Sequence, residues 1–270
     1  MPVTAADVKR LRDETDAPMM ECKNALEEAN GDFEKAKQIL REKGKAAAAK
    51  RAGRATSEGA VAFALSPDAK TVGGVVLECE TDFVAKNPDF IALASELAEA
   101  ARDSGITDPA DPYYSAKTDA AVAKIRENIR LAKAVRLQSD FPIATYVHHD
   151  RKTGVAVLSS GDAAGTEPVR QIAIHAAWSK PEVLAKENLS QEALEAELET
   201  ETRRAIKEGK PEEIAKKIAQ GRVDKDFVKR VALLEQGFYT DQAKTVSQFL
   251  AENAKGTTIT GFELLAVGQT

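Results

Sequence analysis

The sequence predicts an α+β protein built from several domains, and three patterns favour this class. Helical patterns with capping residues fill the N-terminal part of the chain. Two similar pairs of apolar segments follow, each ahead of another helical pattern, which indicates a duplicated unit of one β-hairpin and one helix with antiparallel sheets. A highly charged stretch then contains two more helical runs. The composition, 43% apolar but only 5% aromatic, also disfavours a large all-β core.

The N-terminal segment is predicted to form three short helices. Thr4 can cap the first helix, with Asp7 three residues further on. Pro18 suits the start of the second helix, and Asp32 can cap the third. Helices this short are marginal alone, so we expect them to pack on one another as a bundle.

A basic connector follows the bundle. Between Arg41 and Arg54 the chain carries six Lys and Arg residues and a single Glu. Such a run is typical of a solvated linker helix, and a contact with an anionic partner is the alternative.

The two hairpin–helix copies share a Lys-Thr pair ahead of the second strand, at Lys70-Thr71 and at Lys152-Thr153. Gly73-Gly74, inside the first copy, suggests a bulge or the close approach of another segment. Residues 117–128, between the copies, are predicted to form a further helix. The predicted strands and helices are residues 61–65, 72–77 and 88–102 in the first copy, and residues 143–147, 155–158 and 168–178 in the second.

The charged stretch is predicted to form a protruding antiparallel helical hairpin, a coiled-coil arm, because neither helix can bury its apolar stripe alone. Its two helices are divided at Gly209-Lys210-Pro211. A last helix at residues 245–254 and a closing strand at residues 257–267 follow. The residues that mark the two stripes of the arm are Leu194, Leu198, Ile214 and Ile218. The predicted domains are the N-terminal module 1–42, the basic linker 43–57, a core N-subdomain 58–139, a core C-subdomain 140–188 plus 236–270, and the arm 189–235.

Composition also limits the classes of function. The formal net charge of −5 argues against direct binding of nucleic acid or of acidic membranes. No apolar run approaches the length of about 18 residues that a membrane helix needs, and no signal peptide is evident. Cys22 and Cys79 lie far apart without a CxxC pair, which favours a reducing, cytoplasmic location.

No motif predicts catalysis, a metal site or a resident cofactor. The sequence has no HExxH, GxSxG or GxxxxGK[ST] pattern. His148 and His149 are neighbours in a strand pattern, so we expect them to point to opposite faces and not to share a metal. His175 lies on an amphipathic helix pattern, where a lone histidine is more often a structural residue. The chain is therefore expected not to be an enzyme.

The informative segment is Thr81-Asp82-Phe83-Val84-Ala85-Lys86-Asn87, between a strand and a helix. Asn87-Pro88 predicts an N-cap and a first helical residue, so the helix starts only after this segment. Capping does not explain Phe83. The ring either folds into the core or stands on the loop as an anchor for a protein partner.

These residues resemble the family of bacterial elongation factor Ts along nearly the whole chain. The segment from Thr81 to Asn87 matches the family's TDFVAKN signature letter for letter. Further matches, in the family's order, are Val8 to Arg12, Met19-Met20, Cys22-Lys23, Ala29 to Asp32, Ile174 to Ala177, Ser179 to Pro181 and Gly209 to Pro211.

The resemblance implies a guanine nucleotide exchange factor with a ubiquitin-associated-like N-terminal bundle. Its partner would be the GTPase elongation factor Tu, whose bound GDP and Mg²⁺ it acts on without a cofactor of its own. Asp82 and Phe83 would insert near the partner's magnesium and phosphate site, with His175 supporting that contact. The bundle would bind the same domain through Arg12, Met19 and Met20, and the arm would reach a second region of the partner or another copy of this chain.

Three departures from the family pattern stand out. Asp16 and Pro18 replace glycines ahead of Met19-Met20, and Gln236-Gly237-Phe238 replaces Gln-Pro-Phe. The sequence stops at Thr270, where some members continue with a further helix, so we expect that contact with the GTPase to be missing. Two rival functions are compatible with parts of the sequence: nucleic-acid binding through the basic connector, and an adaptor that uses only the N-terminal bundle.

Overall fold

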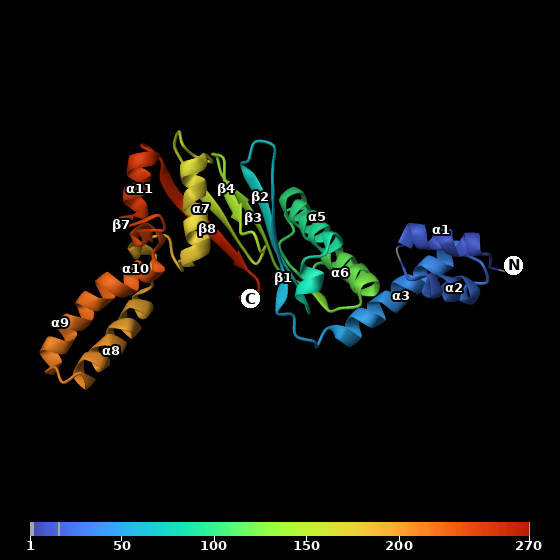
Figure 1. The fold of residues 1–270 in the computed structure, drawn as a ribbon, viewed down its shortest axis with the longest axis horizontal. Coiled ribbons are helices and arrows are strands. Elements are labelled where there is room, and N and C mark those ends of the chain that lie inside the picture. The colour runs from blue at the N-terminus through green and yellow to red at the C-terminus, as the bar shows by residue number, and fades with distance from the viewer. Residues whose placement is uncertain (1–2, 16, 270) are drawn as a thin grey trace.

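The computed structural model describes residues 3–15 and 17–269. The molecule is elongated, with a helical bundle at one end, a helical hairpin at the other and a core of sheets between them (Figure 1).

Three helices form the N-terminal bundle: α1 (Ala5–Thr15), α2 (Met19–Glu28) and α3 (Phe33–Arg51). Two of the predicted caps are confirmed. The backbone N–H of Asp7 donates to Thr4 Oγ1 over 3.2 Å, and that of Lys35 donates to Asp32 Oδ1 over 3.0 Å. Pro18 stands at the N-cap of α2 rather than inside it. Asp16 lies outside the described residues.

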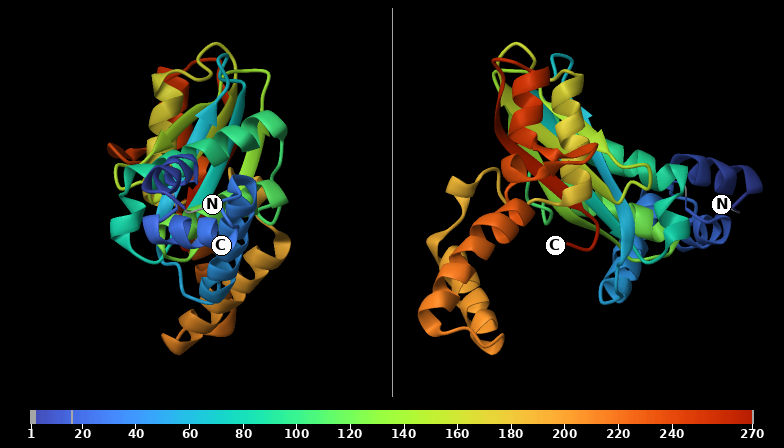
Figure 2. Two further views of the ribbon diagram at one scale, coloured as in Figure 1. Left: turned by 90° about the vertical axis from the view of Figure 1, so that its right-hand side faces the viewer. Right: turned by 60° about the vertical axis from the view of Figure 1, so that its left-hand side comes forward.

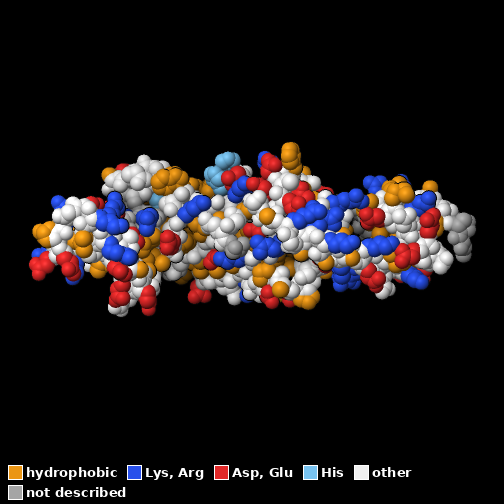
Figure 3. Space-filling view, turned by 90° about the horizontal axis from the view of Figure 1, so that it is seen from below, with side chains coloured by type: hydrophobic (Ala, Val, Ile, Leu, Met, Phe, Trp, Pro, Cys, Tyr) orange, Lys and Arg blue, Asp and Glu red, His pale blue; other side chains and the backbone are white. Residues whose placement is uncertain are grey.

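The basic connector is helical, as predicted, but it is no separate element. It forms the second half of α3, which continues without a break to Arg51. Figure 3 shows Lys and Arg side chains gathered along the surface between the bundle and the core, where α3 lies.

The core has two halves of similar topology, which confirms the predicted duplication. The first sheet has the order β1-β2-β3 and the second the order β4-β5-β8, with all neighbours antiparallel. The elements of the first half are β1 (Glu58–Leu65), β2 (Thr71–Cys79), α4 (Asp82–Ala85), α5 (Pro88–Ser104), α6 (Pro112–Ile125) and β3 (Ile129–Gln138). Those of the second half are β4 (Ala144–Val147), β5 (Thr153–Ser160), α7 (Glu167–Ser179), β6 (Gly237–Phe238), β7 (Asp241–Thr245), α11 (Val246–Asn253) and β8 (Thr258–Ala266).

The two large sheets pack face to face, with helices on their outer sides (Figures 1 and 2). Val61 and Val76 of the first sheet share a buried cluster with Leu265 of the second. Helices α5 and α6 cover the outside of one sheet, and α7 and α11 cover the outside of the other. The result is a four-layer core in which each half has its own helix–sheet interior.

The predicted close approach at Gly73 is confirmed. A Cβ atom on Gly73 would lie 2.0 Å from the carbonyl oxygen of Ala98, so α5 rests directly on β2 at this point. The irregularity in the pairing of β2 with β3 lies elsewhere, opposite Val76 and Leu77, where β3 has the extra residue Ala132.

One helix boundary was wrong, and the strands β3, β6 and β7 were missed. Helix α6 runs from Pro112 to Ile125 rather than over residues 117–128, because Asp111 caps it and Arg126 ends it in the left-handed region at φ 68°. The chain after Arg126 then enters β3, for which no strand was predicted.

The arm is an antiparallel pair of helices, α8 (Gln191–Lys207) and α9 (Glu212–Arg222), which projects away from the core (Figure 2). The predicted turn at residues 209–211 separates them. The interface between the two helices contains alanines, since Ala205, Ala215 and Ala219 are fully buried. Ile214 is 50% exposed, so the predicted stripe on α9 was wrong at that position.

Short segments join the arm to the second half of the core: η1 (Lys186–Asn188), the π-helix η2 (Val223–Phe227), α10 (Val228–Val231) and η3 (Leu233–Glu235). Within the described residues, no helix combines the length and the apolarity needed to cross a membrane.

Candidate protein-binding surface

The turn after β2 separates the segment Thr81–Asn87 into a buried and an exposed side. Thr81 caps the short helix α4, and its hydroxyl accepts a hydrogen bond from Val84 N over 3.4 Å. Ala85 is buried under the turn, whereas Phe83 is 84% exposed. The interpretation that Phe83 folds into the core is therefore wrong, and the ring stands free at the surface.

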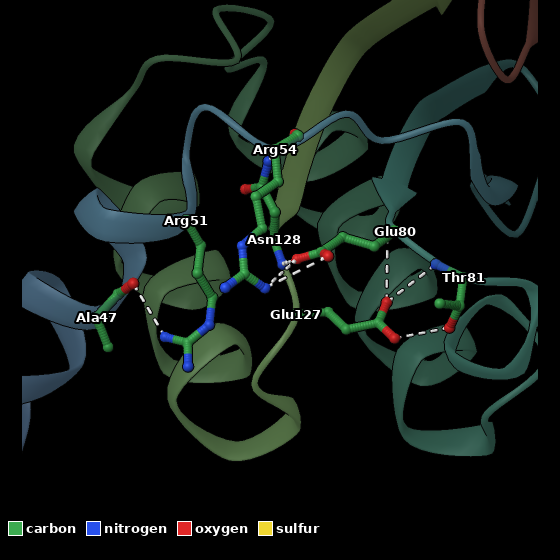
Figure 4. A network of polar contacts seen from close by, with 7 residues as sticks. All are labelled: Ala47, Arg51, Arg54, Glu80, Thr81, Glu127 and Asn128. Atoms are coloured by element: carbon green, nitrogen blue, oxygen red, sulfur yellow. Dashed lines mark hydrogen bonds and ion pairs between the residues drawn. The ribbon is translucent and has the colours of Figure 1, made fainter.

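Glu127, which comes just before β3, fixes this turn (Figure 4). Its carboxylate accepts hydrogen bonds from the backbone N–H groups of Glu80 and Thr81, over 3.1 and 3.0 Å. Its other oxygen accepts from the Thr81 hydroxyl over 2.6 Å. The turn that carries Phe83 is thus held by a residue from the segment that joins α6 to β3.

The side chain of Glu80 makes the reciprocal contacts, from the turn to the segment that contains Glu127. Its carboxylate accepts from the backbone N–H of Asn128 over 2.7 Å and from Arg54 Nη1 over 3.2 Å. The Asn128 side chain donates to the backbone oxygen of Arg54 over 2.7 Å. The backbone hydrogen bond from Asn128, with the Arg54 contact as a smaller cause, lowers the pKa of Glu80. Three chain segments therefore meet at the base of the turn (Figure 4).

Asp82 and Lys86 form an ion pair on the open side of α4, 2.7 Å long. The hydrogen bond from Lys86 lowers the pKa of the Asp82 carboxyl. Asn87 then caps α5 as predicted, because its side-chain oxygen accepts from the N–H of Asp89 over 2.9 Å. The aromatic ring of Phe83 and the carboxylate of Asp82 are thus carried by consecutive residues of a turn that hydrogen bonds hold in place.

A groove lies beside Asp82, and the turn between β4 and β5 forms its opposite side. Its lining includes Asp82, Ala85 and Lys86 on one side and residues 149–152 on the other. The two halves are joined here, since Val61 N donates to Arg151 O over 2.7 Å and Lys152 pairs with Glu58 over 2.6 Å. Sequence reasoning did not connect this turn with Asp82, because the contact depends on how the two sheets pack.

His148 and His149 lie at that turn, just past the end of β4, and not within a strand. Their ring centroids are 4.2 Å apart, so the expectation that they point to opposite faces was wrong. His148 Nδ1 is 2.8 Å from the Tyr146 hydroxyl. Over the part of the chain that the structure describes, no group of three or more potential metal ligands comes together.

His175 is fully buried in the second half of the core. Its Nε2 lies 3.0 Å from Oε1 of Gln236, which also accepts from the Ser179 hydroxyl over 2.7 Å. The Gln236 amide nitrogen donates to Arg230 O, at the base of the arm. Burial lowers the pKa of His175. The structure therefore places His175 in a network between α7 and the arm rather than at the surface.

The candidate binding residues of the bundle lie apart from the turn that carries Phe83. Arg12, Met19 and Met20 are exposed, and Met20 is 63% exposed. They belong to the bundle at the far end of the molecule from the arm (Figure 1). The surface candidates thus form two separate regions: the Phe83 turn on the core and the methionine pair on the bundle.

Fold and topology define a multi-domain α+β protein with two three-stranded antiparallel sheets and two helical extensions. A protein-family model described as Elongation factor TS matches residues 80–269, from the base of the Phe83 turn to the end of the second half. An elongation factor Ts of Thiobacillus denitrificans is 42% identical over 275 aligned residues, which cover 99% of this chain and 92% of that protein. Those of an Azoarcus species and of Desulfovibrio desulfuricans are 43% and 40% identical, covering 99% and 97% of this chain and 91% and 96% of theirs. The chain belongs to the elongation factor Ts family.

Proposed function

We propose that this chain is a guanine nucleotide exchange factor that binds elongation factor Tu with GDP bound and accelerates the release of GDP. Family membership supports the class of function. The observation that carries the contact is the exposure of Phe83, 84%, on a turn that Glu127 and Thr81 hold rigidly. Burying a ring that is already ordered removes a large apolar area from water at little conformational cost.

The proposed mechanism needs no catalytic group in this chain. A GTPase holds GDP through backbone N–H groups of its phosphate loop and through Mg²⁺. Phe83 and Asp82 insert beside the elements that support this ion and shift them. Each 1.4 kcal/mol lost from the free energy of nucleotide binding raises the dissociation constant of the nucleotide about tenfold. No bond is made or broken, so the chain acts as an exchange factor and not as an enzyme, and it carries no cofactor of its own.

The exchange is reversible because the coupling is reciprocal. If the factor weakens nucleotide binding, then incoming nucleotide weakens binding of the factor by the same ratio. GTP, on entering the partner, thereby releases this chain for another cycle.

Other parts of the molecule have proposed roles as well. The bundle, as a ubiquitin-associated-like module, contacts the same GTPase through Arg12, Met19 and Met20. The arm acts as a coiled coil on a second region of the partner. His175, being buried, contributes only by positioning α7 and the base of the arm. The proposed location is the cytoplasm, where translation proceeds, and no direct contact with nucleic acid is required.

The test is release of a fluorescent GDP analogue from elongation factor Tu. We expect the chain to accelerate release, and the double variant Asp82→Ala with Phe83→Ala to lose most of the acceleration. Phe141→Ala is the matched control, because Phe141 is also an exposed ring of the core but lies outside the turn. An unimpaired double variant would show that the turn is not the active contact.

A further inference from the structure

Helix α3 takes part in two hydrophobic interiors. Its first half buries Ala36 and Leu40 among the residues of the bundle, such as Leu26 of α2. Further along the same helix, Ala48 packs against the interior of the first half of the core. Since an α-helix is stiff over this length, a helix that is anchored at both ends connects the two parts firmly.

Between these anchors α3 meets α6 at close range. Gly44 is buried on α3, and a Cβ atom there would lie 3.3 Å from Cβ of Ala123. Such a contact is tighter than ordinary van der Waals packing, so glycine permits the approach of the two helices. A second contact crosses the same boundary, since Arg126 at the end of α6 pairs with Glu21 of α2 over 3.0 Å. These four residues, Glu21, Gly44, Ala123 and Arg126, are called the seam below.

We propose that the seam makes the bundle and the first half of the core one rigid unit, which holds Met19 and Met20 at a fixed separation from Phe83. This inference rests on the proposed function, in which both regions bind the same GTPase domain. Once one region has bound, a fixed and matching separation turns the second contact into an intramolecular event. The seam residues are thus positioning residues, and they set which spacing of two surface pockets a partner must have.

The rigidity can be measured without any partner. Spin labels on Lys9→Cys in α1 and Glu99→Cys in α5 report the distance between the bundle and the core, because both positions are exposed whereas Cys22 and Cys79 are fully buried. We expect a single narrow distance distribution in double electron–electron resonance. A broad distribution would overturn the inference.

Gly44→Leu tests the seam itself. Leucine favours the helix more than glycine does, so α3 stays formed while its side chain pushes α6 away. Ala46→Leu is the matched control, since Ala46 lies on the same helix but is exposed. In Gly44→Leu alone we expect a broadened distance distribution and a concentration for half-maximal GDP release raised about tenfold, with a nearly unchanged maximal rate.

The outcomes separate the two proposals. A chain that shows the narrow distribution but never accelerates GDP release retains the rigid unit and loses the proposed function. A broadened Gly44→Leu that still reaches half-maximal release at the original concentration would show that the fixed separation is not used. Equal effects of Gly44→Leu and Ala46→Leu would also overturn the role of the seam.

Discussion

The carboxylate of Glu127 holds Thr81 from 46 residues away in the sequence, with bonds of 3.0 Å to its backbone N–H and 2.6 Å to its hydroxyl. This relationship matters because Thr81 begins the turn that presents Phe83. A braced turn does not have to be ordered when a partner binds, so less of the contact's free energy is spent on ordering.

Replacing Glu127 with Ala should therefore affect both stability and exchange. The change leaves the N–H groups of Glu80 and Thr81 without their acceptor in a partly buried place, which costs about 1–3 kcal/mol of unfolding free energy. Urea denaturation measures this cost, and GDP release measures the loss of exchange. Glu127→Gln keeps an acceptor oxygen for the N–H groups and should retain most of both properties. Equal loss in the two variants would show that charge, not the bracing geometry, is what counts.

Phe83 and Phe90 should separate binding from stability. Phe83 is exposed, so Phe83→Ala should change the unfolding free energy by less than about 0.5 kcal/mol while it abolishes most exchange activity. Phe90 is fully buried in α5, and Phe90→Ala should destabilise the fold by about 3–5 kcal/mol. Thermal unfolding and the GDP release assay, run on both variants, measure the two effects. A Phe83→Ala protein as unstable as Phe90→Ala would contradict the free position of the ring.

Local sequence patterns were enough to predict the helices and strands whose ends are marked by capping or turn residues. Asp32 and Asn87 lie at the caps that the sequence predicts, and the two hairpins fall at the predicted turns. By contrast β3 was missed. At the edge of its sheet only Ile129, Leu131 and Ala134 are buried, and its other residues are half-buried or exposed, so no clean apolar pattern marks it.

The candidate site was predictable only in part, for a similar reason. The segment from Thr81 to Asn87 stands out by its residue types, whereas Glu127 and the turn at residues 149–152 reach it through pairing of distant strands and packing of two sheets. The position of His175 likewise depended on Gln236, which the chain brings next to it only after the whole arm. Helical periodicity alone could not tell a buried network from a surface contact.

Gly73 should tolerate no side chain. An added Cβ would lie 2.0 Å from the backbone oxygen of Ala98, so Gly73→Ala must push α5 off the sheet. We expect a loss of about 1–3 kcal/mol in unfolding free energy, as for other overpacked interiors. Gly261→Ala in β8 is the control, because nothing lies within 4 Å of a Cβ there, and it should be close to neutral. Chemical denaturation of the two variants decides between close packing and a general intolerance of strand glycines.

His175 should make stability depend on pH. The oxygen Oε1 of Gln236 is an acceptor, since it accepts from Ser179 while the amide nitrogen donates to Arg230 O, so His175 must donate from Nε2. Its Nδ1 then carries a lone pair, and this buried atom has no hydrogen-bond partner among the residues that the structure describes. Adding a proton there would create an unpaired buried charge, and burial accordingly lowers the pKa of His175 below its ordinary value of 6.5.

The sign of this effect follows from which state binds the proton. Below about pH 6.5 the unfolded chain takes up a proton at this residue and the folded chain does not, so the contribution of His175 to stability is complete above that pH and decreases as the pH falls. The slope from this one group reaches at most about 1.4 kcal/mol per pH unit. We expect the unfolding free energy, measured in urea between pH 7.5 and pH 5, to fall more steeply in the unchanged protein than in His175→Gln. His149→Gln is the control, since His149 lies on the turn beside the groove rather than in the interior. Parallel pH profiles for the unchanged protein and His175→Gln would show that the buried imidazole is not what titrates.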